Sequence, residues 1–482
     1  MHGSNWLVPA RGRIGLHEGV GRVPLLPADD SQVLDAARVA AVHAPGTTAP
    51  QRLLGSPRQA AVRGKALELV TQLLLVTVVP RLLGPAEFGR MTVALAIVTL
   101  GALTITLGAP SAFVRFVPAE SGSRRAGLAR SMTLQVLPVR AIQLTAVAAI
   151  AALLVFTASR IDALDAGLVF VALAAEVGAV VAAQIALGMG ETWIWSFRIS
   201  ARNLALLVLV PLLATFAGSA GVTASVALGS LAGFAFAASC VLPLVRHAEQ
   251  GVPVPPGAMQ FGRVAGVSIV LGQLSWRGPV IAASLLGLAA DEVGFAGLAA
   301  SIAMAIIFAV RELFTVSVPE LVESWGRDQS ATDRLMRRLG ERTQWVLVAS
   351  AILGVVALDR VLPLVVGDRF TPAVAPMITV LAMLPLLPLP AMGLQSASLR
   401  LRPGIPVAIE GASLVSFIMA SLVLVPRWHA VGATGALLVA TVTSAVLNAR
   451  ALPTVVTPRI LLTGLVGTGG VLGIAAAMGI WS

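Results

Sequence analysis

Apolar runs about as long as a membrane-spanning helix recur along the chain from residue 66 to residue 480, separated by short polar stretches. A bilayer core requires about 20 consecutive apolar residues per crossing helix, so these runs predict transmembrane helices rather than the core helices of a soluble domain. We predict thirteen of them, twelve in a regular pattern and one more at the end: residues 66–83, 90–109, 137–157, 164–188, 200–217, 222–244, 265–288, 293–317, 345–366, 373–393, 405–425, 430–448 and 460–480.

The composition agrees with a lipid environment, since 57% of the 482 residues are hydrophobic and only 12% are charged. A soluble domain usually carries about 25% charged residues. The net charge of +11 would suggest nucleic acid in a soluble protein. Here most arginines fall before residue 66 and in the connections after even-numbered segments. By the positive-inside rule this predicts a multi-pass protein of the cytoplasmic membrane whose N-terminus faces the cytoplasm.

The first 60 residues differ from the rest, being rich in Pro, Gly and Arg and without an apolar signal-peptide core. We expect residues 1–60 to form a disordered cytoplasmic tail. A start codon assigned too far upstream is the alternative explanation, and the sequence does not choose between the two.

An internal repeat predicts the domain organisation. Leu82-Leu83-Gly84 precedes Glu87-Phe88-Gly89, and Leu285-Leu286-Gly287 precedes Glu292-Val293-Gly294. A fainter echo pairs residues 221–224 with residues 432–435. Because six segments separate the copies, both enter the membrane in the same direction. We therefore expect an all-α membrane protein with two six-helix lobes, residues 61–246 and 261–450, related by a pseudo-two-fold axis along the membrane normal, and an extra helix in 458–482.

Motifs for catalysis and cofactor binding are missing from the sequence. Gly64-Lys65 lacks the other glycine of a phosphate-binding loop, and neither a nucleophile elbow nor a Cys/His pair is present. The single Cys240 and five scattered His residues give no metal-ligand spacing. We therefore expect no enzyme activity, no cofactor and no metal.

Charged residues inside the apolar segments are the candidates for a binding site, because each costs roughly 2.5 to 3.5 kcal/mol at the centre of a membrane helix. Arg277 and Arg311 would line a water-filled cationic cavity that binds substrate, with Trp276 stacking on a sugar and Arg63 and Lys65 at the cytoplasmic entrance. The alternatives are structural roles: an ion pair of Arg277 with Glu176 or Glu410, an Arg311 side chain that extends to the cytoplasmic end of its helix, and a Trp276 ring packed in the bundle. Lys65 and Glu68, one turn apart, could likewise form only a local pair. Candidates for coupling to a cation or proton are Glu68, Glu176, Glu312 and Glu410.

Four stretches of the chain carry a resemblance to a known family: residues 81–89, Leu107 to Phe116, the segment from Trp276 through Gly294, and Val366 to Phe370 with Ala373. They resemble the Wzx-type polysaccharide biosynthesis flippases of the multidrug/oligosaccharidyl-lipid/polysaccharide exporter (MOP) superfamily. The resemblance covers about residues 60 to 450. The chain departs from the family at Pro279, where the family has an acidic residue, which puts ion coupling at that place in doubt.

The resemblance implies a flippase that moves undecaprenyl-pyrophosphate-linked oligosaccharide across the membrane by alternating access. Its implied partners are the lipid-linked oligosaccharide, membrane lipid and the glycan polymerase and glycosyltransferases of the same pathway; nucleic acid is not expected. A multidrug or cation antiporter of the same fold is the alternative, and a membrane glycan polymerase or ligase is a third. Essential glutamates rather than arginines would favour the antiporter, and covalent sugar transfer would favour the enzyme.

Overall fold

A computed structural model describes residues 57–480, except for short gaps at 109–111, 114–115, 121, 159–161, 247, 317–320, 322–323, 326–327, 401 and 403. The described part is helical and contains no strand. Its elements are α3 (Pro57–Leu83), α4 (Pro85–Ile105), η1 (Val117–Ala119), α6 (Gly122–Ala158), α7 (Ala163–Met189), α8 (Thr192–Arg246), α9 (Ala258–Leu285), α10 (Ala290–Val316), α12 (Gln329–Val366), η2 (Asp368–Ala373), α13 (Val374–Met383), η3 (Leu384–Leu386), α14 (Pro388–Leu399), α15 (Gly404–Ala451) and α16 (Pro458–Ala477).

Within the described residues, the predicted apolar segments fall on these helices to within a few residues at their ends, with 373–393 divided among η2, α13, η3 and α14. The all-α membrane fold is confirmed. Ten helices of the described part are long and apolar enough to cross a bilayer, with α8 and α15 counted once each. Both are about twice the length that a bilayer needs, 55 and 48 residues. Each contains two predicted segments. The predicted tail lies almost wholly outside the described residues, so its disorder stays a prediction.

The breaks inside α8 and α15 occur at matching places and support the internal repeat. Gly218 has φ 55° and ψ −132°, and His429 has φ 52° and ψ −127°. Three residues after each break stands the glycine of the fainter repeat, Gly221 or Gly432, packed against the carbonyl of Leu213 or of Leu424. The number of residues between the two members is the same for three pairs: Gly218 and His429, Gly221 and Gly432, and Leu213 and Leu424. The two halves therefore contain the same turn.

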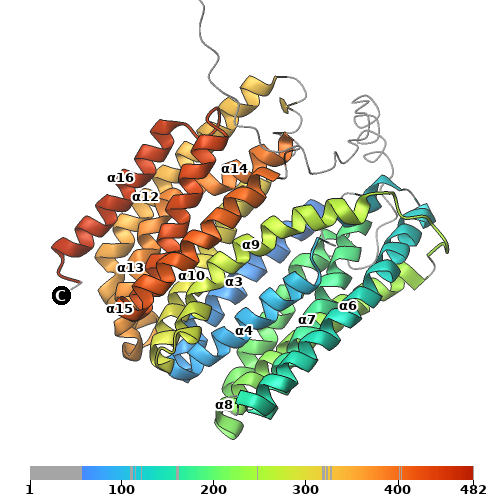
Figure 1. The fold of residues 1–482 in the computed structure, drawn as a ribbon, viewed down its shortest axis with the longest axis horizontal. Helices are drawn as coiled ribbons and strands as arrows, with labels where there is room; N and C mark the ends of the chain where they lie inside the picture. Colours follow the sequence, from blue (N-terminus) through green and yellow to red (C-terminus); the bar gives the residue numbers. More distant parts are fainter. Residues whose placement is uncertain are drawn as a thin grey trace, which may run out of the picture. The chain divides into compact units, whose positions relative to one another are not determined.

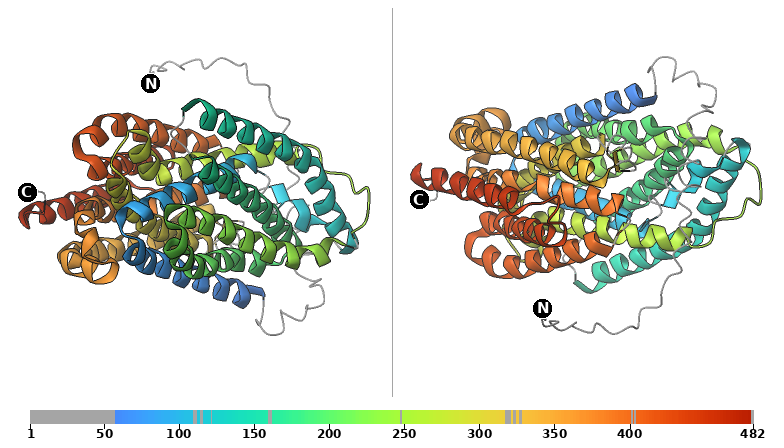
Figure 2. Two further views of the ribbon diagram at one scale, coloured as in Figure 1. Left: turned by 90° about the horizontal axis from the view of Figure 1, so that it is seen from below. Right: turned by 90° about the horizontal axis from the view of Figure 1, so that it is seen from above.

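The helices pack in two groups that follow the order of the chain (Figures 1 and 2). In the first, α7 packs along α6 and α8, and α8 packs against α3. In the second, α13 packs on α15 and α16, and α12 packs against α16 and η2. Helices α9 and α10 begin the second half of the chain, and they also contact α4 of the first half. The lobe boundaries 61–246 and 261–450 stay a prediction.

The two copies of the Glu-x-Gly motif meet where α4 crosses α10. A Cβ atom added to Gly89 would lie 2.8 Å from the Ala290 carbonyl oxygen and 2.8 Å from the Gly294 nitrogen. A Cβ atom on Gly294 would in turn collide with the Pro85 carbonyl. Glycine on both helices is therefore what lets the two backbones approach, as in other close crossings of membrane helices. Equivalent residues of the two halves touch, as expected near a two-fold axis.

Helix α12 is much longer than a bilayer crossing requires. Its 38 residues measure about 57 Å at 1.5 Å per residue, against a hydrocarbon core of about 30 Å. The Asp328 side chain caps its first turn by accepting a hydrogen bond of 2.8 Å from the Ser330 backbone N–H. The arginines between residues 334 and 342 belong to this continuous helix.

Candidate functional site

A buried group of charges, which we call the Glu176 cluster, lies between α7, α8 and α9. Glu176 Oε1 is 3.6 Å from Arg198 Nη1, and Glu176 Oε2 is 3.5 Å from Arg202 Nη1. The side chains of Glu176 and Arg198 are each 7% exposed, and that of Arg202 is 14% exposed. Arg277 of α9 adds a third guanidinium that interacts electrostatically with both Glu176 and Arg202. Glu176 is thus the shared carboxylate of three arginines.

The Glu176 cluster carries more positive charge than its carboxylate neutralises. Buried guanidinium nitrogens of the three arginines have no hydrogen-bond partner within the described protein: Arg198 Nε and Nη1, Arg202 Nε and Arg277 Nε. A buried ion is stable only when it is paired and hydrogen-bonded. The cluster therefore lacks acceptors, and an anion with several oxygens would supply them, since the planar guanidinium fork suits phosphate geometry.

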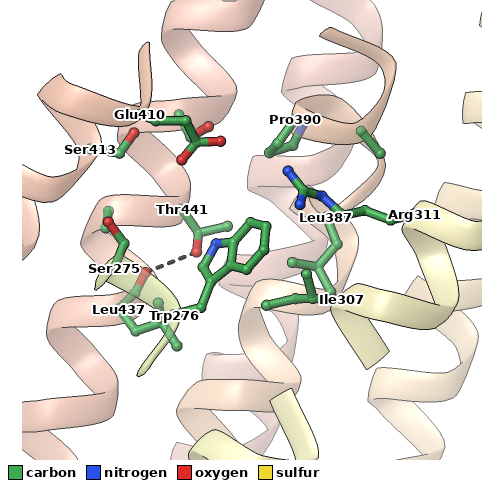
Figure 3. A pocket seen from close by; sticks show the side chains of 13 residues that line it. Ser275, Trp276, Ile307, Arg311, Leu387, Pro390, Glu410, Ser413, Leu437 and Thr441 are labelled. Carbon is green, nitrogen blue, oxygen red and sulfur yellow. Dashed lines mark hydrogen bonds between the residues drawn. The ribbon is translucent and has the colours of Figure 1, made fainter. Parts of the chain in front are cut away.

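A second polar site lies between α9, α10, α14 and α15 (Figure 3). Arg311 and Glu410 both point into it, and the Arg311 guanidinium carbon stands 4.2 Å from the centre of the Trp276 ring. Hydroxyls of Ser275, Ser413, Thr441 and Ser444 complete its polar lining. We call it the Arg311–Glu410 cavity. Its volume is about 30 Å³, room for about two water molecules.

Two consecutive residues of α9 serve the two sites. Trp276 lines the Arg311–Glu410 cavity, whereas Arg277 interacts with the Glu176 cluster. Neighbouring residues point about 100° apart on a helix, so they cannot share one face. The sequence grouped Arg277 and Arg311 in one cavity, and the structure instead divides them between two sites, each containing a carboxylate. Of the two partners considered for Arg277, the structure brings it to Glu176; Glu410 interacts with Arg311.

The remaining candidates gather at one end of α3 and α10. Lys65 Nζ is 3.0 Å from Glu68 Oε2 and 3.5 Å from Glu312 Oε1, which links the two helices. Glu68 also interacts electrostatically with Arg198 of the Glu176 cluster. Arg63 is exposed at the start of α3. The local Lys65–Glu68 pair considered from the sequence is therefore formed, and it is extended by a contact between the halves.

The sequence does not single out Arg198 and Arg202, because the predicted segments leave residues 189–199 as a connection and put Arg202 at the very start of the next segment. The structure ends α7 at Gly190, whose φ is 90°, and starts α8 at Thr192. Both arginines consequently lie inside a helix, four residues apart and on one face. That spacing, followed by Asn203 before an apolar run, was the available signal. Asn203 is itself buried, and its amide nitrogen is 3.3 Å from Gln72 Oε1 of α3.

Comparison with known proteins identifies the fold. No family model matches the chain, and no curated protein matches it. Among solved structures, the chain is similar to the lipid II flippase MurJ in an inward closed conformation, with 12% identity, a TM-score of 0.64, and coverage of 85% of this chain and 90% of that one.

Two further solved structures share this fold. A multidrug resistance MATE transporter in an inward-facing conformation is 14% identical, with a TM-score of 0.58 and coverage of 85% of this chain and 96% of that one. A MOP superfamily transporter from Pyrococcus furiosus is 15% identical, with a TM-score of 0.57 and coverage of 89% and 99%. The chain is a multi-pass membrane protein with the fold of the MOP superfamily transporters.

Proposed function

We propose that the chain is an ATP-independent flippase for an anionic, lipid-linked oligosaccharide in the cytoplasmic membrane, with its N-terminus in the cytoplasm. The diphosphate of the carrier lipid binds the arginines of the Glu176 cluster, and the sugars follow between the two halves. Rocking of the halves then exposes the sugars on the other side. Enzymes that build and polymerise the same glycan are the proposed partners.

The observation that carries this proposal is the excess of guanidinium groups in the Glu176 cluster: three arginines surround Glu176, and Glu68, the second carboxylate that interacts with Arg198, is itself paired with Lys65. In a poorly solvated site such an excess attracts an anion and repels an organic cation. Unpartnered guanidinium nitrogens supply the donors that a diphosphate needs. These features support an anionic cargo over the cationic drugs of an antiporter with the same fold.

Transport would require the two halves to separate from the arrangement described here. The Arg311–Glu410 cavity, at about 30 Å³, is far too small for a sugar. The halves touch near both ends of α4, through Gly89 and Gly294 at one end and through Gly108 and Gly262 at the other. Closed contacts of this kind fit one stage of an alternating-access cycle, in which one of the two crossings opens at a time.

The test is translocation of a defined lipid-linked oligosaccharide in proteoliposomes. Arg198→Gln, Arg202→Gln and Arg277→Gln each remove a charged donor worth about 1.5 to 3 kcal/mol, so we expect the rate to fall about 10-fold to 100-fold. The matched control is Arg334→Gln, which changes an exposed arginine outside the membrane and should leave the rate unchanged. Full rates in all three folded variants would overturn the proposal.

A cation- or proton-coupled antiporter is the second candidate, and the Arg311–Glu410 cavity favours it. A carboxylate beside a small polar cavity within the membrane is the kind of site that exchanges a cation or proton. For an antiporter, Glu410→Gln should abolish transport of an organic cation such as ethidium, whereas Arg277→Gln should not. If Arg277→Gln and Arg311→Gln both leave glycan export intact while Glu410→Gln abolishes drug export, the antiporter is the correct assignment.

A further inference from the structure

An apolar groove runs between α3, α10 and α12. Its volume is about 630 Å³. Almost all of its lining is aliphatic, and the polar residues among its walls are Gln72, Arg342 and Thr343. Leu69, Leu73, Leu313 and Val346 are exposed there. In a membrane, such a surface meets hydrocarbon chains.

The groove is about one leaflet deep. Along α10 it extends from Ile302 to Leu313, about 16 Å at 1.5 Å per residue. Half of a hydrocarbon core of about 30 Å is about 15 Å. Arg342 lies one turn before Val346 on α12, where the charged N-terminal part of the helix gives way to its apolar part. Beside it, Trp345 is 63% exposed, as expected for an aromatic ring at the lipid headgroups.

Only two helices separate the groove from the interior between the halves. On α3, Gln72 lines the groove and also accepts a hydrogen bond from Asn203, a neighbour of Arg202 in the Glu176 cluster. On α10, Val310 lines the groove while the next residue, Arg311, lines the Arg311–Glu410 cavity. A polyprenyl chain bound in the groove therefore lies beside the proposed route of its head group. A bulk phospholipid, which is not transported, would gain nothing from binding at this position.

We propose that this groove is the loading site for the polyprenyl chain of the lipid-linked substrate, with the diphosphate held by Arg342 at its open end. This inference rests on the proposed function and adds to it a step that precedes binding in the Glu176 cluster. The aliphatic walls fit the hydrocarbon chain, and the exposed guanidinium of Arg342 fits the anionic head.

The experiment uses the full chain in proteoliposomes with a photoreactive polyprenyl diphosphate that carries a diazirine on its chain. Cross-linked residues are mapped by mass spectrometry. We expect them in α3, α10 and α12 along the groove. Ala309→Trp fills the groove and should abolish this labelling, and Arg342→Glu should lower it about fivefold or more by reversing the charge that meets the diphosphate.

Matched controls lie elsewhere on α12. Ala349→Trp adds the same ring on an exposed position outside the groove, and Arg360→Glu reverses a charge near the other end of the helix. Both should label like the wild type. If Ala309→Trp does not fold, Leu73→Trp fills the groove from α3, where the side chain is 53% exposed.

Two results would overturn the proposal. The first is that the groove variants are labelled as strongly as the wild type. The second is that a diazirine phosphatidylglycerol labels the groove equally and competes with the polyprenyl probe, which would make the groove a site for bulk lipid. Translocation measured in the same vesicles separates this inference from the proposed function. If the probe does not label the groove but the lipid-linked oligosaccharide is translocated normally, only the loading site is refuted. If the probe labels the groove but no translocation occurs, the proposed function is refuted.

Discussion

Replacing Glu176 by Gln tests the electrostatics of the buried cluster most directly. The substitution keeps the side-chain shape but removes the carboxylate that Arg198, Arg202 and Arg277 share. At an effective dielectric constant of about 20, a pair at 3.5 Å contributes about 5 kcal/mol of attraction before the cost of desolvation. Removing one partner of a buried pair typically costs about 3 to 5 kcal/mol because the other charge stays buried.

We expect the lower part of that range. Separations of 3.5 and 3.6 Å exceed the 2.7 to 2.9 Å of a strong charge-assisted hydrogen bond, so the native pairs are not optimal. Glu176→Gln should therefore lower the free energy of unfolding by about 3 kcal/mol. The measurement is thermal or denaturant unfolding in nanodiscs, with Glu341→Gln, an exposed position on α12, as the matched control.

An added anion provides the sharper part of the test. If the cluster lacks acceptors, inorganic diphosphate should stabilise Glu176→Gln more than it stabilises the wild type, because the vacated carboxylate position leaves more uncompensated positive charge. Loss of stability without any recovery in diphosphate would mean that the cluster only holds helices together. A change in stability below about 1 kcal/mol would refute the electrostatic reasoning altogether.

Three further predictions concern the backbone. Gly294→Leu forces a side chain into the α4 backbone and should lower the free energy of unfolding by about 3 kcal/mol or more. Gly473→Leu places its side chain in open space and should not lower it. Equal thermal stability of the two variants would contradict the close crossing. His429→Gly removes a positive φ from a side chain that resists it and should raise stability by about 1 to 2 kcal/mol in the same assay; no gain would mean that the turn is unstrained. Hydrogen bonds from the Ser330 hydroxyl and the Ala331 backbone N–H hold the pKa of Asp328 below its ordinary value, so the cap of α12 is present above that value and is lost as pH falls through the lowered pKa. Asp328→Asn keeps a cap that does not titrate, and hydrogen exchange in the first turn should then stay slow in acid; identical behaviour of both proteins would refute the role of the carboxylate.

The helices could be predicted from the sequence because the bilayer imposes their length and composition. Each apolar run had to satisfy its backbone hydrogen bonds internally, which leaves helix as the available structure. The joins inside α8 and α15 were predicted as well, because the gaps between the predicted segments, residues 218–221 and 426–429, contain the backbone breaks at Gly218 and His429.

The site could be predicted only in part. Arg277, Arg311, Glu176 and Glu410 stood out because charge is costly within an apolar run. Which of them meet depends on the direction of each side chain around its helix and on the packing of helices distant in sequence. Side-chain direction and helix packing place Trp276 in the Arg311–Glu410 cavity and Arg277 in the Glu176 cluster. Neither can be read from hydropathy. Arg198 went unrecognised because α8 begins at Thr192, well before the predicted segment 200–217, so hydropathy left Arg198 in a connection.

The crossing of Gly89 and Gly294 bears on how such a chain can arise. Because each motif copy contacts the other, the same glycine pair would form between two separate copies of a single half, placed side by side in the same membrane orientation. Duplication and fusion of an ancestral gene would then preserve an existing dimer contact without requiring a new one. A half-length protein with one Glu-x-Gly motif should accordingly self-associate through that glycine, and a bulky residue there should leave it monomeric.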